Sequence, residues 1–202
     1  MNQHIKKERG LEGIIIVNKP SGMTSHDVVL RVRRVLGIRR VGHAGTLDPL
    51  ATGILIILIG KATKLFSRFE SFDKGYRATL LLGTRTRSAD IQGDVLRREP
   101  YEKITRDQVE SALQRFVGEI DQLPPMVSAV KVKGRRLYEL ARQGLEVERK
   151  ARRIRINRLD LSTFELPHIQ ISLECSKGTY VRQIAEDLGE ALGCGACITQ
   201  IE

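Results

Sequence analysis

The chain has 202 residues, of which 41% are hydrophobic and 4% aromatic, and it contains no tryptophan. This composition is typical of a globular protein whose core is mainly isoleucine, leucine and valine. Lysine and arginine number 34 against 24 aspartate and glutamate residues, so the formal net charge is +10. That charge favours a polyanionic partner. The apolar run at residues 54–59 is far too short to cross a bilayer, which excludes membrane insertion.

The cysteines indicate a reducing compartment. Cys175, Cys194 and Cys197 form an odd set, and no signal peptide is recognisable at the amino terminus. Cys194 and Cys197 have the spacing of half a zinc site, but neither Cys175 nor His168 has ligand-like spacing to them. We therefore expect structural thiols, no metal and a cytoplasmic location.

The first predicted elements are two short apolar strands with a helix between them. Residues 14–17 and 54–59 are apolar runs bounded by turn residues, which predicts strands buried on both faces of a sheet. Thr24 and Asp27 have the spacing of a capping box, and Gly37 supplies a stop signal. The apolar spacing between them predicts a helix that buries one side and exposes arginines on another.

Between that helix and the second strand lies a glycine-rich loop that contains a single carboxylate, Asp48. Gly42, Gly45 and Gly53 permit positive φ or close backbone approach, and Pro49 favours an extended Asp48. Asp-Pro with nearby glycines is also an ordinary turn. A shaped loop at the mouth of a buried strand nevertheless suits a catalytic group.

The rest of the chain predicts more strands than helices. A capping box at Thr105 and Gln108 opens a helix that Gly118 should end, and a last helix should start near Val181 and end at Gly193. A short helix is possible at 136–142. Strands are predicted at residues 76–82, 93–96, 127–132, 154–161 and 169–175. We expect one domain of mixed α/β (α+β) class, with a largely antiparallel central sheet flanked by helices and loops.

Basic residues cluster in two segments, and a polar loop lies between these segments. The loop at 83–93 can hydrogen-bond phosphates or remain in solvent, and the basic segments can be solvated faces or phosphate contacts. The two clusters comprise Arg31, Arg33, Arg34, Arg39 and Arg40, and Arg149, Lys150, Arg152, Arg153 and Arg155.

Residues 42–53 closely resemble the signature of the TruB family of tRNA pseudouridine synthases. Further segments resemble other motifs of that family, at residues 18–25, 74–76, 123–131, 134–138, 178–182 and 192–196. The resemblance implies the pseudouridine synthase fold, with residues 1–202 as catalytic domain and an RNA-binding insertion at about 123–152. Relatives continue beyond Glu202, often with a small RNA-binding PUA domain, so we expect that part of the family's chain to be absent here.

The resemblance implies isomerisation of uridine to pseudouridine without a cofactor. The bond between ribose C1′ and base N1 breaks, the base turns, and its C5 joins C1′. Asp48 is the implied catalytic residue, by covalent addition or by removal of a sugar proton. A buried carboxylate needs a cation nearby to stay ionised, and we expect Arg182 to supply it through a bidentate contact. Otherwise Arg182 is a surface base.

The target uridine must leave its stack to react, so surfaces that replace the lost stacking are expected. By resemblance, Tyr76 stacks on the uracil and assists removal of the C5 proton, and His43 takes the place of the extruded nucleotide. Tyr180 is a further base-contact candidate, because tyrosines are scarce in the chain. Ile201 is expected against the base, and Lys19 is expected to support the site floor. Core filling and turn bonding are the ordinary alternatives.

The expected function is conversion of the uridine at position 55 in the T-loop of tRNA, by a monomer. One alternative is the related catalytic subunit of guide-RNA particles that modify ribosomal RNA. The other is a non-catalytic tRNA-binding or tRNA-folding factor whose affinity comes mostly from the positive charge.

Overall fold

The computed structural model describes residues 10–128, 130–132, 134–141, 143–145 and 147–202. The chain divides into two compact units, Met1–Ser71 and Phe72–Glu202. Each unit is described by itself below.

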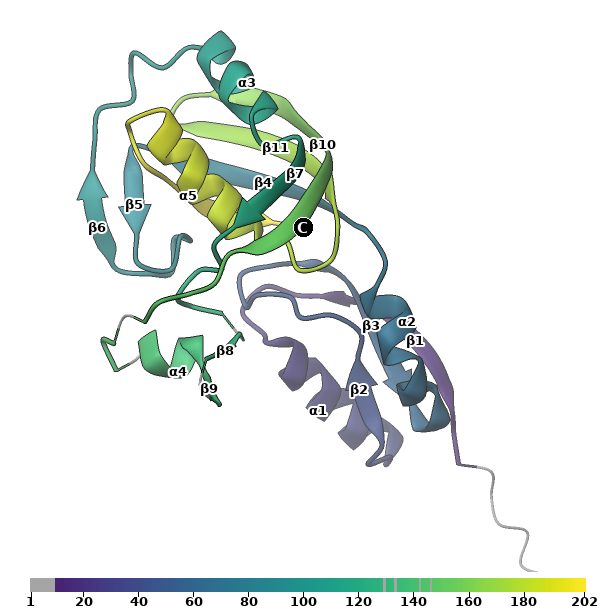
Figure 1. Ribbon diagram of the computed structural model, residues 1–202. Coiled ribbons are helices and arrows are strands. Elements are labelled where there is room, and N and C mark those ends of the chain that lie inside the picture. Colours follow the sequence, from purple (N-terminus) through teal and green to yellow (C-terminus); the bar gives the residue numbers. More distant parts are fainter. Residues whose placement is uncertain (1–9, 129, 133, 142, 146) are drawn as a thin grey trace, which may run out of the picture. The chain divides into compact units, whose positions relative to one another are not determined.

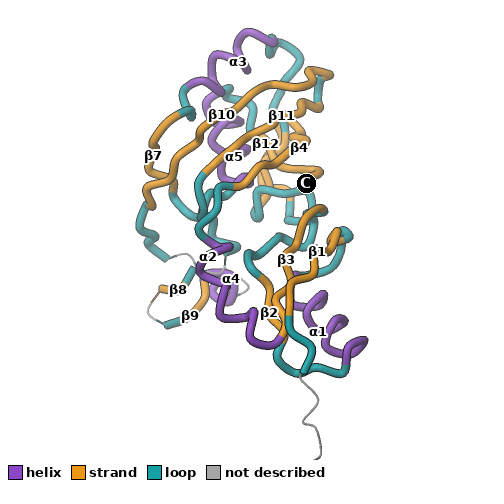
Figure 2. The backbone as a smooth tube through the Cα atoms, turned by 90° about the vertical axis from the view of Figure 1, so that its right-hand side faces the viewer, coloured by secondary structure: helices purple, strands orange, loops and turns teal. Residues whose placement is uncertain are grey.

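The first unit is a three-stranded antiparallel sheet with a helix packed on it (Figure 2). Its strand order is β1-β3-β2. The strands are β1 (Gly13–Lys19), β2 (Val41–His43) and β3 (Gly53–Ile59). Val28 and Val29 of the helix α1 (Ser25–Leu36) join Leu55 and Ile57 of β3 in one buried cluster. A 3₁₀ turn η1 (Gly60–Leu65) and α2 (Phe66–Glu70) follow β3.

The ends of α1 confirm the capping prediction. The Thr24 hydroxyl accepts from the Asp27 N–H, and the Asp27 carboxylate accepts from the Thr24 N–H, which is a complete capping box. Gly37 at the other end has a φ of 64°, the left-handed conformation that glycine adopts most readily. Arg31 and Arg34 on this helix are exposed, as predicted.

The prediction that residues 14–17 are buried on both faces is wrong. Ile14 and Ile16 are 45% and 70% exposed, and on β3 Ile54 is 73% exposed. In the register of the two strands, Ile16 lies opposite Ile56 and Ile14 opposite Leu58, so the exposed side chains share the sheet face away from the helix cluster. The apolar run at residues 14–17 therefore forms a strand that has only one covered face, although its sequence does not alternate.

The second unit is built on a five-stranded antiparallel sheet, ordered β12-β4-β11-β10-β7. Figure 1 labels β4, β7, β10 and β11 of this sheet. Its strands are β4 (Lys74–Leu82), β7 (Gly118–Gln122), β10 (Arg152–Glu165), β11 (His168–Cys175) and β12 (Ala196–Ile201). The helices α3 (Arg106–Gln114) and α5 (Val181–Ala191) contact it, α3 at β10 and α5 at β12 and β4.

Alternation along the strands decides which sheet face is the core. Leu80 of β4 and Ile171 and Leu173 of β11 are buried, whereas residues between them on β11 are less buried. Helix α5 packs on this sheet through Gly189, where an added Cβ would lie 2.1 Å from the backbone nitrogen of Ala196. Only glycine fits at that crossing.

The smaller elements differ most from the sequence predictions. Helix α3 ends at Gln114 rather than near Gly118, which instead begins β7. Among the described residues of the strand predicted at 127–132, only Lys131–Val132 form one, β8. The remaining elements are β5 (Thr84–Thr86), β6 (Val95–Arg98), β9 (Arg135–Arg136) and α4 (Leu137–Ala141).

The predicted class is confirmed, because helices accompany sheets whose named strands pair antiparallel. Whether residues 1–202 act as one catalytic domain stays a prediction. Of the helices in the described ranges, none is long and apolar enough to span a membrane.

Candidate active site

Asp48 lies in a loop that is fixed on both sides of it. The hydroxyl of Ser25 accepts from the Leu47 N–H at 2.9 Å, and the Pro49 carbonyl accepts from the Gly22 N–H at 2.8 Å. The loop then turns back on itself, because the Ala51 N–H donates to the Asp48 carbonyl at 3.0 Å. The half-buried Asp48 is therefore presented from a backbone anchored to the start of α1, as a catalytic carboxylate requires.

Of the three loop glycines, Gly45 and Gly53 have the positive φ that the sequence suggested, whereas Gly42 does not. Gly45 and Gly53 have φ values of 114° and 99°, a region that other residues rarely adopt. Gly53 also begins β3, and its N–H donates to the Asn18 side chain at 3.2 Å. The loop thus passes directly from its turn into the buried strand.

Lys19 contacts the backbone of this loop, and its role in the site floor stays a prediction. Its side chain is fully buried, and its ammonium donates to the carbonyl oxygens of Pro20, Met23 and Pro49 at 2.8, 2.7 and 3.3 Å. Burial lowers the pKa of Lys19, and the carboxylate of Asp48 acts in the opposite direction. Lys19 is therefore a cation close enough to Asp48 to interact with its charge.

His43 ends β2 at the start of the same loop. Its Nδ1 lies 2.6 Å from the carbonyl oxygen of Gly45, an acceptor, so Nδ1 carries the proton. In the neutral ring this leaves Nε2 as a hydrogen-bond acceptor. The ring is half-buried and oriented by its own loop.

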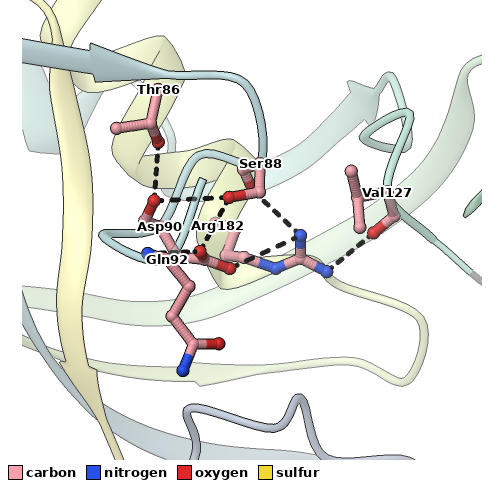
Figure 3. Close-up of polar contacts among 6 residues, drawn as sticks. All are labelled: Thr86, Ser88, Asp90, Gln92, Val127 and Arg182. Carbon is pink, nitrogen blue, oxygen red and sulfur yellow. Dashed lines mark hydrogen bonds and ion pairs between the residues drawn. The ribbon is translucent and has the colours of Figure 1, made fainter. Parts of the chain in front are cut away.

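Arg182 lies in the first turn of α5 and is 4% exposed. Its Nη1 donates to the Ser88 carbonyl and its Nη2 to the Val127 carbonyl, each at 2.9 Å (Figure 3). The carboxylate of Asp90 lies 3.9 Å from Nη1. The reading of Arg182 as an ordinary surface base is excluded by this burial.

Asp90 is a residue that the sequence reasoning missed. It is 7% exposed, and its carboxylate accepts from the Ser88 hydroxyl at 2.7 Å and from the Gln92 N–H at 3.1 Å (Figure 3). Thr86, also buried, donates to the Asp90 carbonyl at 2.7 Å. Thr86, Ser88 and Asp90 of loop 83–93 thus bond one another or Arg182, whereas other polar residues of the loop, such as Gln92, are exposed. The signal was a short polar run crowded with hydroxyls around one aspartate.

Tyr76 and Ile201 lie on one face of adjacent strands. Ile201 of β12 pairs with Ala78 of β4, and Tyr76 precedes Ala78 by two positions, so their side chains point to the same side. Tyr76 is half-buried, and Ile201 is 8% exposed. Ala78 is buried on that face, and α5 contacts both of these strands.

The structure thus forms two groups of predicted site residues, one in each unit. Lys19, His43 and Asp48 belong to the first unit, and Tyr76, Tyr180, Arg182 and Ile201 to the second. The joining of these groups into one site stays a prediction.

The basic clusters and cysteines fall on different parts of the units. Arg31, Arg34, Arg39 and Arg40 are exposed in the first unit, and Arg152, Arg153 and Arg155 in the second. The three cysteines are buried and unbridged. Burial raises the pKa of Cys197 to about 11 and also raises that of Cys175 and Cys194, so these thiols stay neutral. In the described ranges no group of three or more histidine, cysteine, aspartate or glutamate residues could hold a metal ion.

The sequence matches a family model and several known relatives. Residues 33–181 match the model of the TruB family pseudouridylate synthase N-terminal domain. A tRNA pseudouridine synthase B of Opitutus terrae is 50% identical over 192 residues, 95% of this chain and 80% of the relative. Relatives of the same description in Mycobacterium bovis and Syntrophotalea carbinolica are 49% and 50% identical. The chain spans 65% and 62% of their lengths.

A solved structure has the same fold. The crystal structure of a Cbf5-Nop10-Gar1 complex contains a chain that is 28% identical and superposes with a TM-score of 0.72. The match covers 94% of this chain and 47% of that one.

Proposed function

Because the chain belongs to the TruB family of pseudouridylate synthases, which are isomerases, we propose that it converts the uridine at position 55 of the tRNA T-loop to pseudouridine. The sequence identity of 50% and 49% to relatives described as tRNA pseudouridine synthase B supports tRNA as the substrate. The chain has a lower identity, 28%, to the matched chain of the Cbf5-Nop10-Gar1 complex, which disfavours the guide-RNA alternative.

Asp48 starts the reaction in this proposal. Its carboxylate either adds to ribose C1′ as a nucleophile or removes a proton from the sugar, and in both routes the C1′–N1 bond breaks. The base turns and C5 joins C1′, while the Asp48 carboxylate either leaves C1′ or returns the proton that it took from the sugar. The C5 proton then leaves, and N1 ends with a proton. The product is an isomer of the substrate, so no atom is supplied from outside. The anchored backbone around Asp48 supports this role, since it holds the carboxylate at one position.

Two cations act on the Asp48 carboxylate in this proposal. Lys19 interacts with its charge from within the same unit. Arg182 is proposed to hold the carboxylate by a bidentate contact. The buried partners of the guanidinium support this assignment, because they fix its plane before substrate arrives.

The flipped uracil is proposed to lie against Tyr76 and Ile201, whose side chains share one sheet face. Tyr76 stacks on the base and assists loss of the C5 proton, and Tyr180 contacts the nucleotide from the start of α5. His43 fills the space that the uridine leaves. Its ring is oriented by the bond to Gly45, which supports a defined position in the RNA helix.

The basic clusters and the insertion at about 123–152 are proposed to hold the T-arm. Exposed arginines in both units can neutralise phosphates, and affinity should fall as salt rises. Binding of this kind positions the RNA, whereas the loop residues act on the uridine.

The observation that carries the proposal is the fixed Asp48 loop in a chain of this family. The experiment incubates the purified protein with unmodified transcribed tRNA, without any guide RNA, and maps pseudouridine chemically. Pseudouridine at position 55 is expected, and a transcript with cytidine there is the control. Binding without any pseudouridine would support the non-catalytic factor, and turnover only after a guide RNA is added would support the particle subunit.

A further inference from the structure

Gln122 is a buried polar residue that the proposed mechanism does not use. It is the last residue of β7, at the edge of the five-stranded sheet, and is 3% exposed. Its Nε2 donates to the Tyr180 carbonyl at 3.1 Å, and its Oε1 accepts from the Tyr180 N–H at 2.8 Å. One side-chain amide therefore holds both polar groups of one residue's backbone.

These two hydrogen bonds hold the residue at which α5 begins, Tyr180. It is the N-cap of α5, and its own side chain makes no capping hydrogen bond. Its carbonyl also accepts from the N–H groups of Gln183 and Ile184, at 3.1 and 3.2 Å, which are the first bonds of the helix. Gln122 thus fixes the backbone of Tyr180, which carries the tyrosine ring. Arg182 follows two residues later, so its position depends on the same backbone.

A second contact from the same segment holds Arg182 itself. The chain that leaves β7 after Gln122 passes through Pro124 and Pro125, both buried, to Val127. The Val127 carbonyl accepts from Arg182 Nη2 at 2.9 Å. Residues 122–127 therefore contact the first turn of α5 twice, through the backbone of Tyr180 and through the guanidinium.

We propose that Gln122 is a positioning residue for pseudouridine formation. It contacts no substrate in this scheme and acts through the Tyr180 backbone, which places the tyrosine ring and the Arg182 guanidinium. The inference rests on the proposed function, because its effect is read in the rate of that reaction. A displacement of about 1 Å in a site of this kind can cost about a hundredfold in rate.

The first test replaces the amide by an apolar group of similar size. Gln122→Met removes both hydrogen bonds to Tyr180 with little change in volume. The single-turnover rate on unmodified transcribed tRNA should fall about 10- to 100-fold, whereas the Kd for that tRNA should change less than about threefold. Gln114→Met, at an exposed glutamine of α3, is the matched control and should keep the wild-type rate.

The second test separates positioning from a general loss of stability. In Gln122→Glu an ionised carboxylate can only accept, but the protonated acid can both donate to the Tyr180 carbonyl and accept from its N–H. The rate relative to wild type should therefore rise as the pH falls from about 8 to about 5. The rate of Gln122→Met relative to wild type should not change with pH over the same range. If Gln122→Met does not fold, the pH profile of Gln122→Glu decides.

The outcomes distinguish a failure of the Gln122 role from a failure of the proposed function. A wild-type rate in Gln122→Met, a loss of tRNA affinity alone, or a flat ratio in Gln122→Glu would overturn the role of Gln122. Wild-type protein that makes no pseudouridine would overturn the proposed function, and this inference with it.

Discussion

The carboxylate of Asp90 lies 3.9 Å from the guanidinium Nη1 of Arg182, and only 10% and 5% of the two side chains are exposed. Two backbone carbonyls accept from the same guanidinium. A buried cation needs a counter-charge and satisfied donors, so the loop around Asp90 belongs to the surroundings that hold Arg182 in place.

Removing the charge of Asp90 should weaken both the site and the fold. We expect Asp90→Asn to lower turnover about 10- to 100-fold, since Arg182 loses a fixed orientation. The free energy of unfolding should fall by about 1–3 kcal/mol. Chemical mapping of pseudouridine and urea unfolding measure the two effects. Asp94→Asn is the control, because Asp94 forms an exposed pair with Arg87 in the same hairpin. Equal behaviour of both variants would contradict the role of Asp90.

Lys19 should be indispensable to the Asp48 loop. Lys19→Met removes the ammonium that donates to the carbonyls of Pro20, Met23 and Pro49, so the free energy of unfolding should fall by about 2–4 kcal/mol. Turnover should fall with it, because the Pro49 backbone adjoins Asp48. Lys61 is the control, because its side chain is 80% exposed. Lys61→Met should change neither the free energy of unfolding nor the rate of turnover by much. An unchanged melting temperature in Lys19→Met would refute this account.

The buried cysteines predict a loss of stability in alkali. The pKa of Cys197 is raised by burial from 9.0 to about 11, so the folded state favours the neutral thiol. This contribution is fully present below pH 9.0 and is lost as the pH rises through about 11. It is on the order of 1–3 kcal/mol. Urea unfolding across that range should show a steeper fall for wild type than for Cys197→Ala. Parallel curves would contradict the prediction.

How far the sequence predicted this structure depends on the range of the interactions. Local signals were reliable: the capping box at Thr24, the left-handed Gly37 and the loop glycine Gly45 have the conformations that their chemistry predicts. The exposure of Ile16 could not be predicted, because an apolar run does not say which faces are covered. The early end of α3 was missed because Phe116 and Val117 continue its apolar spacing without being helical.

The candidate site was predicted unevenly for the same reason. Asp48 and Arg182 are in motifs that resemble a family, whereas Asp90 and Gln122 act through contacts that span long stretches of sequence. Gln122 meets Tyr180 across 58 positions, and Arg182 meets Ser88 across 94. Only the folded chain brings such residues together.

The exposed arginines of α1 should contribute to RNA binding and not to chemistry. Arg31→Gln combined with Arg34→Gln should weaken tRNA binding and make the salt dependence of log Kd shallower, by about 0.7–0.9 for each lost phosphate contact. The single-turnover rate at saturating protein should stay near that of wild type. Titrations at several salt concentrations measure this, and an unchanged slope would remove these arginines from the RNA interface.

The most direct test of the central claim is the reaction of Asp48→Asn with unmodified transcribed tRNA under single-turnover conditions. The account predicts tRNA binding within about threefold of wild type and a rate of pseudouridine formation at least about a thousandfold lower. The amide keeps the shape of the side chain but can neither add to C1′ nor take a proton. A variant that binds tRNA and isomerises its uridine at the wild-type rate would contradict the account.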